Sequence, residues 1–223
     1  MPRHIVSHLN QDALNSLEIG KAAEIGICVV IIAVVLDKLS LAWANKQKDY
    51  FANLNFYQNG EHIDSILKGI TIIEGKQHVD HHTLVHHIEP NCESHQDYKG
   101  IFDERSTGVF NGKIMVREDS QKIDAFQSNN TLLLSEDATI NSKPQLEIYA
   151  DDVKCSHGCT IGQLDKEALF YMRSRGIGKE EAQAILTYAF ASEAINNITI
   201  NKVAMLAKKL LINKLDVDLD HNI

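Results

Sequence analysis

The sequence has few cysteines and none of the close pairs that build a structural zinc site. Its four cysteines stand at positions 28, 92, 155 and 159, and no two of them form a Cys-x-x-Cys motif. A closed zinc site needs four ligands, which this spacing does not supply. Scattered cysteines without a disulfide framework are typical of a reducing compartment, so we expect a cytoplasmic protein.

Basic residues are also scarce. The 22 lysines and arginines stand against 30 aspartates and glutamates, which gives a net charge of −8. Nucleic acids and anionic membrane surfaces are bound largely through positive charge. We therefore expect no nucleic-acid partner.

Several signatures of catalysis are absent from the sequence. A phosphate-binding loop needs Gly-x-x-x-x-Gly-Lys followed by Ser or Thr, whereas Gly69 and Gly75 have the wrong spacing and Lys76 is followed by Gln77. Neither a Gly-x-Ser-x-Gly elbow nor a His-Glu-x-x-His helix occurs. We therefore expect that the chain is not an enzyme and that any ATP hydrolysis belongs to a partner.

The longest apolar run is short. Residues 25–36 carry no polar side chain, but a membrane-spanning helix needs about 20 apolar residues. A buried helix, a membrane anchor and a secretory signal all remain open from this run. Residues 17–40 resemble the last membrane helix of glycine betaine/proline ABC transporter permeases. We therefore expect residues 1–55 to be an appended hydrophobic helical segment, with a membrane as partner only if this segment inserts.

Short apolar stretches separated by turn-forming residues dominate the middle of the chain. Asparagine, serine and glycine stand between them at 111–112, 128–130 and 141–142, where we expect turns. Many short strands predict a barrel, a sandwich or a solenoid, and spacing alone does not choose among these. The apolar stretches are 70–73, 108–110, 113–116, 123–126, 131–134 and 145–149.

After residue 163 the apolar period changes to that of a helix. The pattern predicts amphipathic helices over 165–175, 179–195 and 199–215. Such helices can cap the end of a solenoid or bind a partner.

Histidines are unusually dense between residues 78 and 95. A helix would align pairs four residues apart for metal binding, but the β-branched neighbours favour a strand. On a strand, His82 and His86 share one face while His81 and His87 share the other. We expect solvated histidines, with a metal site as the alternative. The six histidines are His78, His81, His82, His86, His87 and His95.

The densest chemistry lies in residues 143–162. Alternating apolar residues predict a strand, and if it continues through Gly158, then Cys155, His157 and Cys159 project from one face. Such soft and borderline ligands can hold iron, zinc or a cluster. The alternative is that both cysteines are small packing residues and the histidine is simply hydrogen-bonded.

Two motifs carry a resemblance to a known family. Residues 141–150 followed by Cys155-Ser-His157-Gly, and the run from Gly162 to Gly176, resemble the SufB/SufD family of iron–sulfur cluster assembly scaffolds. The resemblance covers residues 59–223. It implies a mainly β fold, with a right-handed parallel β-helix over 56–162 and a C-terminal helical partner-binding domain over 163–223. The Cys-Ser-His-Gly sequence, in place of a glutamate-containing loop, resembles the SufD branch.

The resemblance also implies a function. It indicates a scaffold subunit of the SUF complex that pairs with SufB, binds the SufC ATPase and holds no cofactor stably alone. A nascent cluster would meet His157 and Cys155 at the SufB interface. Cys159 stands where the family has alanine, and it either adds a metal ligand or fills a small pocket. Candidate SufC contacts are Asp165, Phe170, Tyr171, Arg173, Arg175 and Gly176. The alternatives are a SufB-type cluster-holding paralogue and a metal-binding β-fold enzyme that uses the histidine-rich segment.

Overall fold

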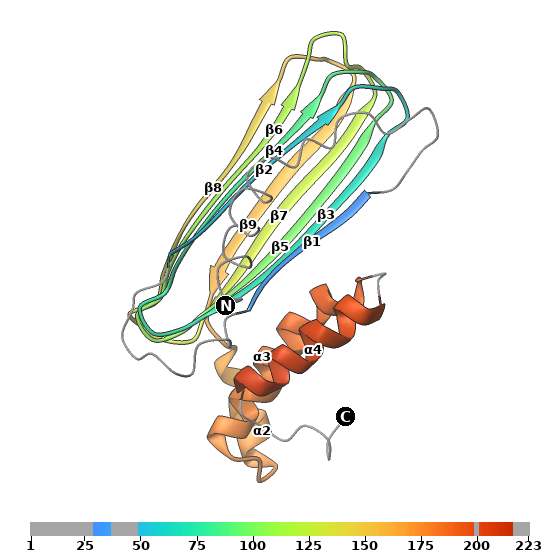
Figure 1. Cartoon of the computed structure of the whole chain (residues 1–223). Helices are drawn as coiled ribbons and strands as arrows, with labels where there is room; N and C mark the ends of the chain where they lie inside the picture. Colours follow the sequence, from blue (N-terminus) through green and yellow to red (C-terminus); the bar gives the residue numbers. More distant parts are fainter. Residues whose placement is uncertain (1–28, 37–48, 199–200, 216–223) are drawn as a thin grey trace, which may run out of the picture.

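Two parallel β-sheets form most of the molecule (Figure 1). The computed structural model describes residues 29–36, 49–198 and 201–215. One sheet has the strand order β1-β3-β5-β7-β9, and the other has the order β2-β4-β6-β8. The strands are β1 (Val29–Leu36), β2 (Asp49–Gln58), β3 (Asp64–Ile73), β4 (His78–His87), β5 (Glu93–Phe102), β6 (Thr107–Val116), β7 (Ile123–Leu133), β8 (Thr139–Ile148) and β9 (Val153–Gly162).

Successive strands alternate between the two sheets, so the chain winds as a solenoid. Each strand pairs in parallel with the strand two places later; residue 64 lies beside residue 93, 93 beside 124, and 124 beside 154. From β2 to β9, one coil therefore takes 29 to 32 residues. The mainly β class and the parallel solenoid that the family resemblance implied are confirmed.

The polar residues expected to separate strands lie inside them instead. Residues 111–112 are within β6, 128–130 within β7 and 141–142 within β8. The tertiary structure gives these side chains partners. Ser128 Oγ donates to Asp97 Oδ1 of the neighbouring coil at 2.8 Å, and Asn129 Nδ2 donates across to Ser142 Oγ of the opposite sheet at 2.8 Å. The turn prediction was therefore wrong, because contacts with neighbouring coils outweigh the local preference of Asn and Ser for turns.

Apolar side chains at alternate strand positions fill most of the space between the sheets. Tyr98 and Phe110 pack with ring centroids 5.1 Å apart, and they contact Leu67 and Val85 in one buried cluster. Full burial of such a side chain contributes about 1.5 to 3 kcal/mol. The core is thus built from residues on four different strands rather than from sequence neighbours.

The final strands are less covered than the central ones. Neither β8 nor β9 has a buried residue, whereas β5 is buried along most of its length. Among the described strands, β9 and β8 each end the order of their sheet. The inward-facing side chains of these two strands therefore line an open end of the solenoid.

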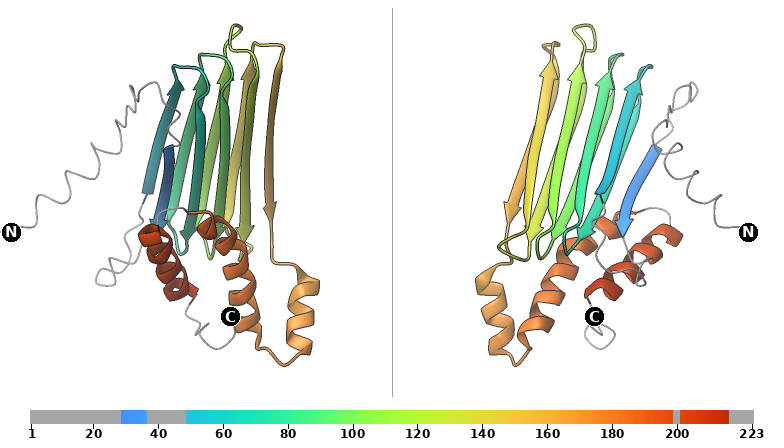
Figure 2. Two further views of the ribbon diagram at one scale, coloured as in Figure 1. Left: turned by 90° about the vertical axis from the view of Figure 1, so that its right-hand side faces the viewer. Right: turned by 60° about the vertical axis from the view of Figure 1, so that its left-hand side comes forward.

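Three helices follow β9 and lie along the side of the solenoid where the strands of the five-stranded sheet end (Figure 2). They are α2 (Lys166–Ser174), α3 (Lys179–Asn196) and α4 (Asn201–Leu215), close to the ranges that the sequence predicted. Ala191 and Ile195 of α3 pack with Leu211 of α4 against Ile70 and Ile101 of the five-stranded sheet. The helices thus cover the outer face of this sheet near the carboxyl ends of its strands.

A buried lysine holds α3 to the sheet. The Lys99 side chain on β5 is only 4% exposed. Its Nζ donates to the Phe190 carbonyl at 3.1 Å and to the Glu193 carboxylate. The same nitrogen lies 4.6 Å from the centroid of the Phe190 ring. Hydrogen bonding and charge from Lys99 lower the pKa of Glu193. A buried ammonium is costly unless it is paired, so this site favours one docking position of the helix.

The appended hydrophobic helix expected at the N-terminus is not confirmed. Most of residues 1–55 lie outside the described residues. Of residues 1–55, the structure describes 29–36 and 49–55. Residues 29–36 form β1, which pairs with β3, and β2 crosses the expected boundary at residue 55. Residues 29–36 thus form backbone hydrogen bonds with β3 along one side instead of the hydrogen bonds of a helix. In the part of the chain that the structure describes, no helix has the length and apolarity to cross a membrane.

Candidate functional site

The strand β9 presents the cysteine and histidine residues singled out by the sequence. It runs unbroken through Gly158 from Val153 to Gly162. Cys155, His157 and Cys159 lie beside Ala125, Gln127 and Asn129 of β7. The β7 residues are buried, and register partners in a sheet point to the same face. The three candidate ligands therefore share the inward face, as the alternating pattern predicted.

Their surroundings differ along the strand. Cys155 is partly buried against the cluster that contains Ile123 and Ala125, while His157 and Cys159 are exposed. Burial raises the pKa of the Cys155 thiol; an interaction with the Ala125 backbone opposes this change, and the charge of Asp124 adds to it. Since the thiolate is the metal-binding form, Cys155 is not pre-ionised. His157 is the accessible nitrogen ligand at this end of the solenoid.

The described residues contain no group of three or more His, Cys, Asp and Glu side chains close enough to hold one metal ion. On a strand, alternate residues lie about 6.6 Å apart. Cys155, His157 and Cys159 are therefore a row of donors along an open edge rather than a closed cage. Such a row is suited to a metal site whose remaining ligands come from another molecule.

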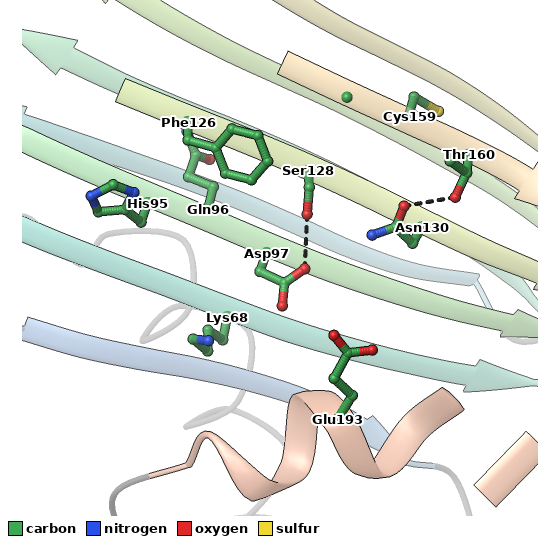
Figure 3. A pocket seen from close by; sticks show the side chains of 11 residues that line it. Lys68, His95, Gln96, Asp97, Phe126, Ser128, Asn130, Cys159, Thr160 and Glu193 are labelled. Atoms are coloured by element: carbon green, nitrogen blue, oxygen red, sulfur yellow. Dashed lines mark hydrogen bonds between the residues drawn. The ribbon is translucent and has the colours of Figure 1, made fainter. Parts of the chain in front are cut away.

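A groove of about 480 Å³ lies next to β9 on the outer face of the five-stranded sheet (Figure 3). Hydrogen-bonded polar pairs cross it, including Thr160 Oγ1 to Asn130 Oδ1 at 2.6 Å. Lys68 contributes one positive charge, and Asp97 and Glu193 contribute two carboxylates. This mixture of charges does not select an anionic or a cationic ligand.

Five of the six histidines of the run lie on the strand β4, as predicted, and they divide between two faces; His95 lies on β5. His81 and His87 point inward and are buried, whereas His78, His82 and His86 lie on the outer face. Residues four apart on a strand are separated by about 13 Å, too far for shared coordination. His86 is also shielded, packing 5.8 Å from the Tyr57 ring. The expectation that these histidines are solvated is wrong for His81 and His87, because the solenoid encloses alternate residues, and for His86, because the Tyr57 ring packs against it on the outer face.

A row of polar side chains inside the solenoid was not predicted from the sequence. Gln96 and Gln127 are fully buried at inward positions of β5 and β7, next to the register position of His157. Glutamine within an apolar strand pattern has no local feature that predicts burial. Only the stacking of coils, about 30 residues apart in sequence, places these side chains in line.

The candidate partner-binding residues on α2 fall into two groups. Asp165 caps the helix, with Oδ1 accepting from the Glu167 amide at 2.8 Å, and Gly176 follows the helix with a φ of 88° that favours glycine. Phe170 and Tyr171 are 75% and 58% exposed. Among the charged candidates, Arg173 is exposed, and the Arg175 guanidinium lies 5.0 Å from the Tyr171 ring.

Exposed aromatic residues on a short helix with no buried residue form a distinctive surface. Aromatic and arginine side chains are enriched at protein interfaces. We call Phe170, Tyr171, Arg173 and Arg175 the α2 patch. Asp165 and Gly176 already have structural roles at the two ends of the helix.

Comparison with known proteins gives a family. The family model described as "SUF system FeS cluster assembly, SufBD core domain" matches residues 40–190, starting earlier than residue 59. The matched part is 42% identical over 141 residues to the iron–sulfur cluster assembly protein SufD of Escherichia coli, covering 63% of this chain and 33% of that protein. It is 40% identical over 148 residues to a SufBD family iron–sulfur cluster assembly protein of Synechocystis, covering 66% of this chain and 33% of the relative.

A plant relative, the chloroplastic protein ABCI7 of Arabidopsis thaliana, is 38% identical over 144 residues, with coverage of 64% and 30%. The chain therefore spans about one third of the length of the curated relatives that it matches. The family match covers both sheets from β2 onward and extends into α3. This chain belongs to the SufBD core family of SUF-system proteins, which act in iron–sulfur cluster assembly.

Proposed function

We propose that this chain is a non-catalytic, SufD-type scaffold subunit of the cytoplasmic SUF complex. In this proposal it pairs with SufB through the open end of the solenoid and binds the SufC ATPase through its C-terminal helices. The nascent iron–sulfur cluster is cargo that assembles transiently at the SufB interface, and the chain alone retains no cluster. Support comes from the family and from the position of His157.

The observation that carries the proposal is the row of donors on β9 at an open end of the solenoid. His157 is exposed on a face that would point into the core if another coil followed. An edge strand with unpaired backbone groups invites pairing with another chain. A partner docked there would cover His157 and complete a cluster site with its own ligands.

A His157→Ala variant of the full chain tests the role in cluster assembly. The ring is exposed, so the unfolding midpoint and SufC binding should match wild type. Activity of an iron–sulfur enzyme should fall in cells that depend on this chain for cluster assembly. A Lys154→Ala variant, at an exposed position on the opposite face of β9, is the matched control. Unchanged enzyme activity in the His157→Ala cells would contradict the ligand role.

Binding of SufC is tested at the α2 patch. The full chain should co-elute with purified SufC on size exclusion, and Phe170→Ser should weaken that complex. Phe51→Ser is the matched control because Phe51 is 70% exposed, but on β2 and far from α2 in the sequence. Equal retention of SufC by both variants would remove the α2 patch from the proposed interface.

A further inference from the structure

A line of polar side chains runs through the interior of the solenoid and ends at His157. Gln96 on β5, Gln127 on β7 and His157 on β9 occupy successive register positions on the inward face. The two glutamines are fully buried, whereas His157 lies at the open end and is exposed. The row therefore connects the closed core with the candidate ligand.

Hydrogen bonds order the inner part of this row. Thr83 Oγ1 donates to Gln96 Oε1 at 3.3 Å, and Gln127 Nε2 donates to the same oxygen at 3.2 Å. The amide nitrogen of Gln127 is thus directed towards β5. Gln127 Oε1 takes no part in this bond to β5, and β9 is the neighbour of β7 on its other side.

The Gln127 oxygen is buried and has no hydrogen-bond partner among the described residues. An unsatisfied carbonyl in the core is costly, and most such groups find a donor. The side chain is also confined, since a Cβ added at Gly112 would lie 2.4 Å from Gln127 Nε2. Gln127 packs directly on the backbone of β6 and cannot turn its oxygen to solvent.

Register partners between β7 and β9 are close enough to bond directly. On the outer face, Thr160 Oγ1 donates to Asn130 Oδ1 at 2.6 Å across these two strands. His157 and Gln127 have the same register relation on the inner face. The structure records no bond between them, so the contact proposed below requires a change in the rotamer of the exposed His157 side chain.

We propose that Gln127 is a positioning residue for His157. Its Oε1 accepts one ring N–H of His157, which selects a single neutral tautomer and leaves the other ring nitrogen free to bind iron at the open end. Metal-binding histidines commonly donate their second ring N–H to a carbonyl or carboxylate, and that bond sets the tautomer and orientation. The inference rests on the proposed role of His157 in handling the cluster.

Ring ¹⁵N chemical shifts of the full chain, labelled at histidine, test the tautomer. His157→Ala identifies the His157 signals, and the wild type above neutral pH should show one dominant tautomer. Gln127→Met preserves side-chain length but removes the acceptor, so the His157 signals should shift to a mixture. Thr131→Val is the matched control, because it removes a buried hydroxyl from the same inward face of β7 that has no hydrogen-bond partner among the described residues, and it should leave the tautomer unchanged.

The wild-type spectrum keeps the test valid even if Gln127→Met does not fold, because a mixture of tautomers in wild type overturns the proposal by itself. For a folded Gln127→Met variant, cluster delivery in cells should fall about 10-fold, the usual size of an orienting contact to a metal ligand. An unchanged tautomer, with delivery still abolished by His157→Ala, refutes the positioning role but leaves the proposed function intact. A changed tautomer, with normal delivery in both variants, supports the contact and refutes the proposed function.

Discussion

Acidification should destabilise this fold through two buried histidines of β4. Burial lowers the pKa of His81 from 6.5 to about 4; the charge of Asp80 opposes this change and His82 adds to it. Burial, with a smaller contribution from His86, lowers the pKa of His87 from 6.5 to about 4. The inward faces of the strands therefore hold these rings neutral.

The sign follows from proton binding. Between pH 6.5 and pH 4 the unfolded chain binds protons at these rings and the folded chain does not, so stability falls as the pH falls through this window. The stability contributed by the neutral rings is fully present above pH 6.5. Going from pH 7 to pH 5 costs about 2 kcal/mol for each ring, and about 4 kcal/mol for the pair.

Urea unfolding of the full chain at pH 7 and pH 5 measures this loss. The double variant His81→Gln, His87→Gln should be less sensitive to pH by about 4 kcal/mol, whatever its stability at pH 7. His78→Gln, on the outer face of the same strand, should keep the wild-type pH dependence. Equal pH dependence in wild type and the double variant would refute the reasoning, because groups other than these two rings would then account for all of the acid sensitivity.

Three further changes have defined outcomes. Gly108→Ala should lower the free energy of unfolding by about 1 to 3 kcal/mol in urea titrations, because the new Cβ would lie 2.4 Å from the buried Phe102 ring. Gly158→Ala is the control, since a Cβ there would meet no atom within 4 Å, and equal losses in the two variants would contradict this packing argument. Asp165→Ala should cost about 1 kcal/mol through loss of the α2 cap, and no change in the thermal midpoint would deny the cap a role. Lys99→Met should increase protease cleavage between β9 and α3, and unchanged cleavage would show that the helices dock without the lysine.

Much of the architecture was predictable from local sequence. Helices α2, α3 and α4 were placed within a few residues because their apolar residues recur with the helical period and their ends carry capping residues such as Asp165 and Gly176. The shared face of Cys155, His157 and Cys159 also followed from the two-residue period of a strand. These are properties of neighbours in sequence, which a single chain reveals directly.

The number and extent of the strands were not predictable in this way. β5 escaped detection because it is largely polar, and the asparagine and serine positions of β6, β7 and β8 were predicted as turns. Each forms part of a strand because a distant residue, on the neighbouring coil or on the opposite sheet, supplies a hydrogen bond or a packing surface. Nothing in the immediate neighbours of these residues records that partner.

The sequence by itself determined the helical tail, the family and the donor row of β9, because each is carried by residues close together in the chain. Only the tertiary structure decided which histidines are buried, where β1 and β2 pair, and that Gln127 lies beside His157. Those facts depend on the register between coils. That register is set by the summed packing of the whole solenoid, and no local pattern encodes it.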